Sequence, residues 1–277
     1  MRVMTFNDLH RSKTIERYTE MDLTQHSAVY NMLSLGIASM LFTSIFLWIA
    51  RDRVLPKFRM AVMVSATVTS IAAYHYFRMF DSFNAAYPVG GDMMKGFAGY
   101  NVGYRYVDWF LTVPLLLVEL VAVIGLARAV QSSLLKRLVP AAALMIVLGY
   151  PGDMHTQLFG LSNSMWGLLS TIPFLYILYV LFVEISKSLA GQSPKVRGLL
   201  QSARVLLIAT WGVYPITFIL AMNQTGAPMF SDVVARELGY SIADILAKCV
   251  FGLIIFTVAR VKSAEESKEF AASEMGH

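Results

Sequence analysis

Seven apolar stretches, each long enough to cross a lipid bilayer, divide this sequence of 277 residues. A helix needs roughly 20 mostly apolar residues to span the hydrocarbon, and only helices or closed barrels satisfy their backbone polar groups there. A hydrophobic share of 56% with a charged share of 15% excludes an ordinary soluble domain. We therefore predict an all-α membrane protein with a single domain over 1–277 and seven spans, near 27–50, 58–80, 104–127, 134–151, 164–187, 199–222 and 234–261.

Lysine and arginine residues gather in the connections on one side of these spans, which the positive-inside rule places in the cytoplasm. The connections on the other side contain only Lys95 and Arg236. The N-terminus is thus predicted outside and the C-terminus in the cytoplasm. The residues assigned to the cytoplasmic side are Arg51, Arg53, Lys57, Arg59, Arg128, Lys136, Arg137, Lys187, Lys195, Arg197, Arg204, Arg260, Lys262 and Lys268.

The net charge of +5 belongs to these connections and forms no basic stripe with interleaved aromatic residues. It therefore indicates a lipid bilayer as partner and no nucleic acid. The one cysteine, Cys249, cannot form an internal disulfide. We expect no cleaved signal peptide in the first 23 residues, and this pattern is compatible with a multi-pass protein of a bacterial inner membrane.

The third stretch, YRYVDWFLTVPLLLVEL, carries carboxyl groups at membrane depth. Asp108 and Thr112 are four residues apart and share a helix face. Asp108 and Glu119 are eleven apart, which returns to within about 20° of one face at a separation of about 16 Å. Each carboxyl could simply satisfy a neighbouring polar group. Ionisable residues in a span are costly and usually functional, however, so the pair is interpreted as two stations of a proton path.

The seventh stretch places Asp244 and Lys248 four residues apart in mid-span. A structural ion pair is the simple explanation, but it does not account for a lysine so far from the interface. A desolvated lysine amine is a good nucleophile toward an aldehyde. We interpret Lys248 as the attachment point of a covalent ligand whose imine cation is balanced by Asp108 and Asp244.

The sixth stretch contains WGVYPITF, in which Trp211, Tyr214, Pro215 and Phe218 fall on one helical face. Such a stripe is usually core packing. Together with a buried lysine and with Trp109 next to Asp108, it predicts a long apolar pocket.

Three motifs, RYVDWFLTVPLLLVE, WGVYP and DILAK, resemble those of the microbial rhodopsins, and the resemblance extends over 27–261. It implies seven helices around all-trans-retinal bound to Lys248 as a protonated Schiff base. By position, Asp108 matches the proton acceptor and counterion, Asp244 the second counterion, Glu119 the cytoplasmic proton donor and Arg105 the arginine beneath the counterions. The resemblance implies a light-driven outward proton pump, an ion transporter rather than an enzyme, with no metal.

The carboxylate, threonine and glutamate at 108, 112 and 119 match proteorhodopsin-like proton pumps. Sodium pumps of this family have asparagine, aspartate and glutamine there, chloride pumps lack the first carboxylate, and sensory members commonly lose the donor. The retinal pocket positions carried over by the resemblance are Trp109, Leu116, Met145, Gly149, Ser170, Trp211, Tyr214, Pro215 and Phe218. Leucine at 116 goes with green absorption.

Two further positions set this sequence within the family. His75 matches the histidine of proteorhodopsins and xanthorhodopsins that partners the counterion aspartate, although a lone histidine can also bind a backbone carbonyl. Gly167 stands where xanthorhodopsin has a glycine that opens a window to a carotenoid antenna. Glycine there can also serve close helix packing, so an antenna carotenoid is an open expectation.

The extracellular glutamate pair used for proton release in bacteriorhodopsin has no match. Arg236 takes the place of one glutamate by spacing, Glu237 is expected to point elsewhere, and Asn223 and Gln224 lie near the other. Fast release through a carboxyl pair is therefore not expected, and the sequence identifies no release group.

Two other functions compete with a pump. A sensory photoreceptor would signal through a partner, but the tail 262–277 holds no recognisable signalling module. A seven-helix receptor or transporter without retinal would be colourless. Relatives form trimers or pentamers, so a homo-oligomer is expected.

Overall fold

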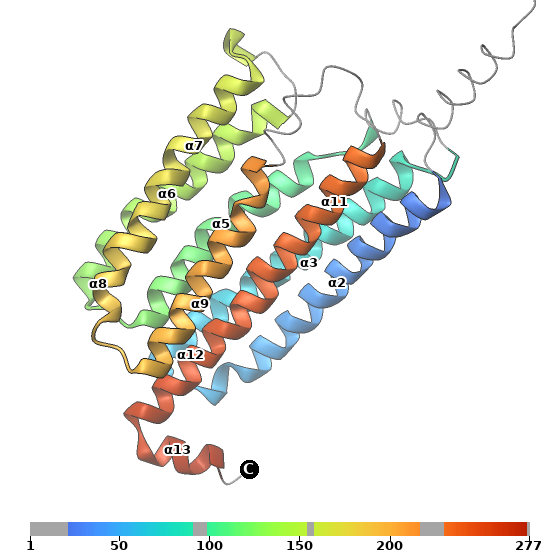
Figure 1. The fold of residues 1–277 in the computed structure, drawn as a ribbon. Helices are drawn as coiled ribbons and strands as arrows, with labels where there is room; N and C mark the ends of the chain where they lie inside the picture. The colour runs from blue at the N-terminus through green and yellow to red at the C-terminus, as the bar shows by residue number, and fades with distance from the viewer. Residues whose placement is uncertain (1–21, 91–98, 154–157, 217–229, 276–277) are drawn as a thin grey trace, which may run out of the picture.

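The computed structural model describes residues 22–90, 99–153, 158–216 and 230–275. Seven of its helical spans are long and apolar enough to cross a membrane, which confirms the predicted fold class. No strand occurs among the described residues. The helical elements, shown in Figure 1, are α2 (Leu23–Ala50), η1 (Arg51–Arg53), α3 (Pro56–Ala86), α5 (Gly103–Ile124), α6 (Arg128–Asp153), η2 (Leu158–Gly160), α7 (Asn163–Tyr179), η3 (Val180–Glu184), α8 (Ile185–Leu189), α9 (Pro194–Trp211), α11 (Phe230–Ile245), η4 (Leu246–Val250), α12 (Phe251–Glu266) and α13 (Lys268–Met275).

Local signals explain where several spans begin and end. Asp22 caps α2 in a capping box with Gln25, and Ser193 caps α9, which has Pro194 in its first turn. The sixth span therefore begins five residues before the predicted 199, and its predicted end at 222 lies outside the described residues. The third span ends at Ile124 rather than 127, because Gly125 takes a left-handed φ of 74°.

The spans pack in chain order from α2 through α3, α5 and α6 to α7, and the later helices close the bundle. In this return, α9 packs on α12, α11 packs on α2, and α12 packs on α3. Arg204 lies buried within α9 rather than in a connection, and it donates to Leu181 O at 2.9 Å and to Ser186 Oγ at 2.6 Å. These bonds join α9 to the end of the α7 span.

Two short π-helical segments interrupt the spans, η3 after α7 and η4 between α11 and α12. Such segments are rare and often mark functional sites. Lys248 lies in η4, so the last span changes its winding at the residue predicted to hold a ligand.

Candidate functional site

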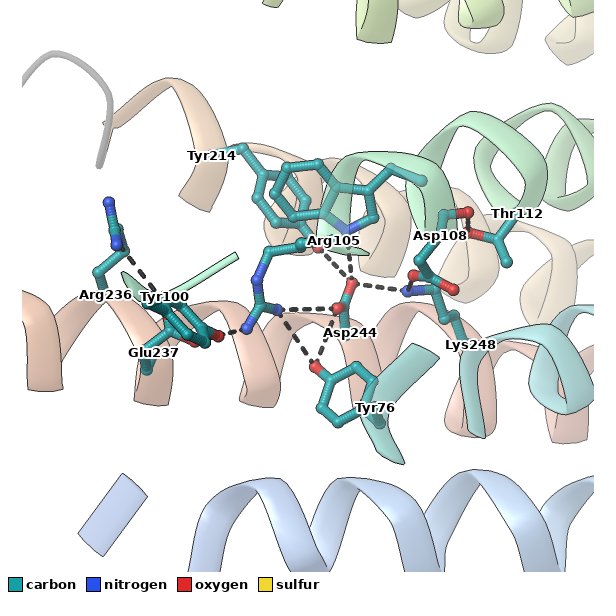
Figure 2. A network of polar contacts seen from close by, with 11 residues as sticks. Tyr76, Tyr100, Arg105, Asp108, Thr112, Tyr214, Arg236, Glu237, Asp244 and Lys248 are labelled. Carbon is teal, nitrogen blue, oxygen red and sulfur yellow. Dashed lines mark hydrogen bonds and ion pairs between the residues drawn. The ribbon is translucent and has the colours of Figure 1, made fainter. Parts of the chain in front are cut away.

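Lys248 is buried between two carboxylates, one on α5 and one on its own span. Its Nζ lies 2.6 Å from Asp108 Oδ2 on α5 and 2.8 Å from Asp244 Oδ1, one turn earlier on α11. All three side chains are at most 2% exposed. Figure 2 shows the amine as the link between the two acids. The arrangement holds one cation against two anions, out of contact with solvent.

Asp244 is held by several donors in addition to the lysine. Its Oδ1 accepts from Trp109 Nε1 at 3.1 Å and from Tyr214 Oη at 2.8 Å. Its Oδ2 accepts from Tyr76 Oη at 2.9 Å. A Cβ at Gly36 would overlap the Tyr76 ring, so α2 needs glycine where that ring packs. Three neutral donors stabilise a charged Asp244.

Asp108 is bound much more loosely. Only its Oδ2 meets Lys248, and Oδ1 has no hydrogen-bond partner within the described chain. Thr112, predicted on the same face, donates to the backbone oxygen of Asp108 at 2.8 Å and not to its carboxylate. Among the described residues, Asp108 therefore has fewer donors than Asp244 around the shared amine.

Arg105 connects this centre to a third carboxylate toward the extracellular end, as Figure 2 shows. Its Nη1 lies 3.3 Å from Asp244 Oδ2 and its Nη2 lies 2.7 Å from Glu237 Oε2. Glu237 also accepts from Tyr100 Oη at 3.0 Å and lies 3.6 Å from Arg236 Nε.

The expectation that Glu237 points elsewhere is therefore wrong. Its side chain is 2% exposed and faces Arg105 in the bundle interior. Glu237 precedes Asp244 by seven residues, which is close to two full helical turns. That spacing signals a shared face. Arg236, which is eight residues before Asp244, lies at the edge of the same cluster.

Glu119 lies on the same helix as Asp108, nearer the cytoplasmic end of α5. It is fully buried, it accepts from the Ser65 hydroxyl, and its Oε1 has no partner among the described residues. No ion pair of the described residues includes it. Burial without a cation favours the neutral carboxylic acid.

His75 lies on α3 and is 7% exposed. Its ring packs edge-on against Tyr74 at 5.1 Å between centroids, and its Nδ1 has no hydrogen-bond partner in the described part of the chain. No hydrogen bond between described residues joins it to Asp108, so its role as counterion partner stays a prediction.

A cavity of about 290 Å³ opens beside the centre, between α5, α6, α7 and α9. Its wall is apolar in effect, because Ser170 donates to Met145 O and Thr171 to Gly167 O. Leu116 is buried but not part of the wall, and Phe218 lies outside the described residues. The predicted positions that do line the cavity are Trp109, Met145, Gly149, Gly167, Ser170, Trp211, Tyr214 and Pro215.

The cavity suits an apolar ligand such as retinal, since its wall combines aromatic and aliphatic side chains. Sequence reasoning missed Tyr106, Phe174 and Tyr240, which also line it. Lys248 is not one of the lining residues, and its amine is engaged by the two carboxylates. Trp109 and Tyr214, both bonded to Asp244, belong to the wall and connect the cavity to the charged centre.

Comparison with known proteins agrees with this geometry. A profile of the family described as bacteriorhodopsin-like proteins matches residues 27–261. The green-light absorbing proteorhodopsin of Gamma-proteobacterium EBAC31A08 is 30% identical over 232 residues, covering 82% of this chain and 84% of the relative.

Two solved structures share the fold along most of the chain. Xanthorhodopsin, described as a light-driven ion pump with dual chromophore, is 44% identical with a TM-score of 0.82, covering 90% of this chain and 98% of its own. A thermophilic rhodopsin is 42% identical with a TM-score of 0.82, covering 90% and 99%. This chain therefore belongs to the bacteriorhodopsin-like family and is a microbial rhodopsin of the bacterial plasma membrane.

Proposed function

We propose that this protein is a light-driven pump that moves protons outward across the membrane. The observation that supports this most strongly is the Lys248 amine between two carboxylates that differ in their hydrogen bonding, Asp108 and Asp244. Glu119 lies buried on the cytoplasmic side of Asp108, on the same helix α5, without a cation beside it. A sensor would need no filled donor position there. Retinal bound to Lys248 Nζ would supply light absorption and an isomerisation that turns this nitrogen and its proton.

In this proposal Asp108 takes the proton from the Lys248 nitrogen. Asp108 Oδ2 is already 2.6 Å from Nζ, within the range for direct transfer, and Oδ1 is free to rotate into contact. Asp244 has its oxygens occupied by Trp109, Tyr214 and Tyr76 and stays charged, which stabilises a cation at the amine.

Glu119 then returns a proton to the Lys248 nitrogen from the cytoplasmic side. Its neutral, buried state lets it hold that proton until the nitrogen is deprotonated. Glu119 then takes up a new proton from the cytoplasm. The first proton leaves Asp108 and passes outward past Arg105 and Glu237, which completes the transport. Access to the nitrogen must change from one side to the other between the two transfers. The sixth span is a candidate for the moving element, since its helix is interrupted at Gly212 close to Pro215, which has no N–H to donate.

The test is the light-induced pH change of cells that express the protein with all-trans-retinal, with and without a protonophore. We expect acidification that the protonophore removes. Asp108→Asn should abolish it, and Glu119→Gln should slow return of the proton by roughly 100-fold, the usual contribution of a positioned acid. Persistent acidification by Asp108→Asn would refute the mechanism. A coloured protein without any pH signal would favour the sensory function.

We also propose that Gly167 admits an antenna carotenoid. Gly167 lines the cavity from α7 beside Leu168, whose side chain is 60% exposed, so a flat polyene on this face could lie close to bound retinal. The dual chromophore described for xanthorhodopsin supports the same reading. Gly167→Trp should remove carotenoid-sensitised pumping and leave direct excitation intact, as read from an action spectrum. Equal action spectra of both proteins would exclude the antenna.

A further inference from the structure

Lys262 is a buried lysine at the cytoplasmic end of the bundle that the proton path described above does not use. It lies near the C-terminal end of α12, which ends at Glu266, and is 7% exposed. Residues that follow it bind two other cytoplasmic segments. Ser263 Oγ accepts from Leu55 N at 2.9 Å, and Ser193 Oγ lies 2.6 Å from Glu265 Oε1.

The Lys262 ammonium joins three elements at one point. Its Nζ donates to Ile124 O at 2.6 Å and to Gln192 Oε1 at 3.1 Å, and it lies 5.2 Å from the centre of the Phe58 ring. Gln192 Nε2 donates to the same Ile124 oxygen at 3.3 Å. The end of α5, the turn before α9 and the start of α3 are thus held against α12. We call Lys262, Ile124 and Gln192 the cytoplasmic clasp.

The cytoplasmic clasp lies at the cytoplasmic end of α5, the helix that carries Glu119. Ile124 follows Glu119 by five residues, or about 7.5 Å along the axis. In this interval the apolar side chains of Leu120, Val121 and Val123 are fully buried. A positive charge at the C-terminal end of α5 also suits its dipole, and it opposes the approach of another cation.

The contact is built into the backbone of α5. Gly125 has a φ of 74°, and a Cβ at this position would lie 3.2 Å from Lys262 Nζ. A side chain there would strain the turn and crowd the ammonium. The glycine thus allows the lysine to reach the last carbonyl of the helix.

We propose that Lys262 is a positioning residue for proton uptake. The cytoplasmic clasp holds the entrance above Glu119 shut, and its opening limits the rate at which a proton from the cytoplasm refills the Glu119 carboxylate. This inference rests on the proposed function, in which Glu119 is the donor.

The experiment uses the full-length protein with retinal in membranes, with a pH-indicator dye and time-resolved absorbance after a flash. Lys262→Met should accelerate proton uptake about tenfold, the effect of losing hydrogen bonds from a charged group, with an unchanged dark absorption maximum. Lys262→Arg keeps the charge and the donors and should restore the wild-type rate. Lys57→Met is the matched control, because it removes an exposed cation at the same end, and it should leave uptake unchanged.

Uptake that is unchanged or slower in Lys262→Met would overturn the proposal. If that variant does not fold, Gln192→Leu decides, since it removes one acceptor of the ammonium and must accelerate uptake as well. Failure of the proposed function can be distinguished from failure of this inference about Lys262. A wild type that does not acidify the medium overturns the pump itself, and a Glu119→Gln variant with normal return of the proton overturns the donor role of Glu119. A working pump with Glu119 as donor and no effect at Lys262 overturns only the cytoplasmic clasp.

Discussion

Asp108 and Asp244 contact the same amine but differ in what else holds them. Asp244 accepts from three neutral donors and meets Arg105, whereas Asp108 keeps a free oxygen in the described chain. Hydrogen bonds to a carboxylate favour its charged form. This difference in contacts, and not a difference in residue type, supports the proposed roles of Asp108 as acceptor and Asp244 as the lasting counterion.

Glu237 is predicted to stabilise the protein through Arg105. Glu237→Gln leaves a buried guanidinium with Asp244 alone, at 3.3 Å. We expect the free energy of unfolding to fall by about 3 kcal/mol, the lower end for breaking a buried ion pair, because one partner remains. The measurement is denaturant unfolding of the detergent-solubilised protein, followed by loss of its absorption band.

The control for Glu237→Gln is the same substitution at Glu184. That residue pairs with Arg137 at 2.7 Å, but the two side chains are 27% and 40% exposed. Solvent screens such a pair, so its loss should cost less than about 1 kcal/mol. Equal losses at Glu237 and Glu184 would contradict a stabilising buried pair.

At the scale of elements, helix ends and helix irregularities position the functional groups. The π-helical segment η4 contains Lys248, and the left-handed Gly125 ends α5 where Lys262 binds. Neither feature is a consequence of apolar periodicity. Each occurs where one element must bring a polar group to a specific neighbour.

Gly125→Ala tests the end of α5. An alanine with a φ of 74° costs roughly 1–2 kcal/mol, and its Cβ would crowd Lys262 Nζ. We expect a lower midpoint of thermal colour loss. Gly198→Ala is the matched control, because Gly198 lies inside α9 with nothing within 4 Å of an added Cβ. It should stabilise the protein by about 0.5–1 kcal/mol. A Gly125→Ala protein as stable as the wild type would show that this turn is unstrained.

At the scale of the whole molecule, the bundle brings helices from the two ends of the sequence together. Arg105 and Glu237 are 132 residues apart, and Lys248 and Asp108 are 140 apart. The centre therefore exists only when the bundle has closed. A covalent ligand at Lys248 would add to that closure, because binding only the folded state stabilises it.

Substitution of Lys248 tests whether this residue is the attachment point of the covalent ligand. Lys248→Arg keeps a cation between Asp108 and Asp244, so the fold should persist, but a guanidinium does not condense with an aldehyde. We expect a folded, colourless protein when all-trans-retinal is added, whereas Lys57→Arg should be coloured like the wild type. Absorption spectra with matched far-ultraviolet circular dichroism make the comparison. Visible absorption of Lys248→Arg would place the attachment elsewhere.

Much of the fold could be predicted because its signals are local. Apolar length identifies each span, the distribution of lysine and arginine orients them, and spacing along a single helix places Asp108 with Glu119 and Asp244 with Lys248. Span ends were less predictable where a cap overrides composition, as Ser193 and Gly125 do. The motifs around these residues were also sufficient to identify the family.

The sequence by itself therefore determined a seven-helix membrane protein, its orientation, and which acidic and basic residues lie at membrane depth. Only the tertiary structure decided which groups meet. It turned Glu237 toward Arg105, left one oxygen of Asp108 free, and brought Lys262 to the end of α5. The physical reason is that periodicity fixes the face of a helix on which a side chain lies, whereas the rotation and depth of each helix against its neighbours depend on packing across the whole bundle.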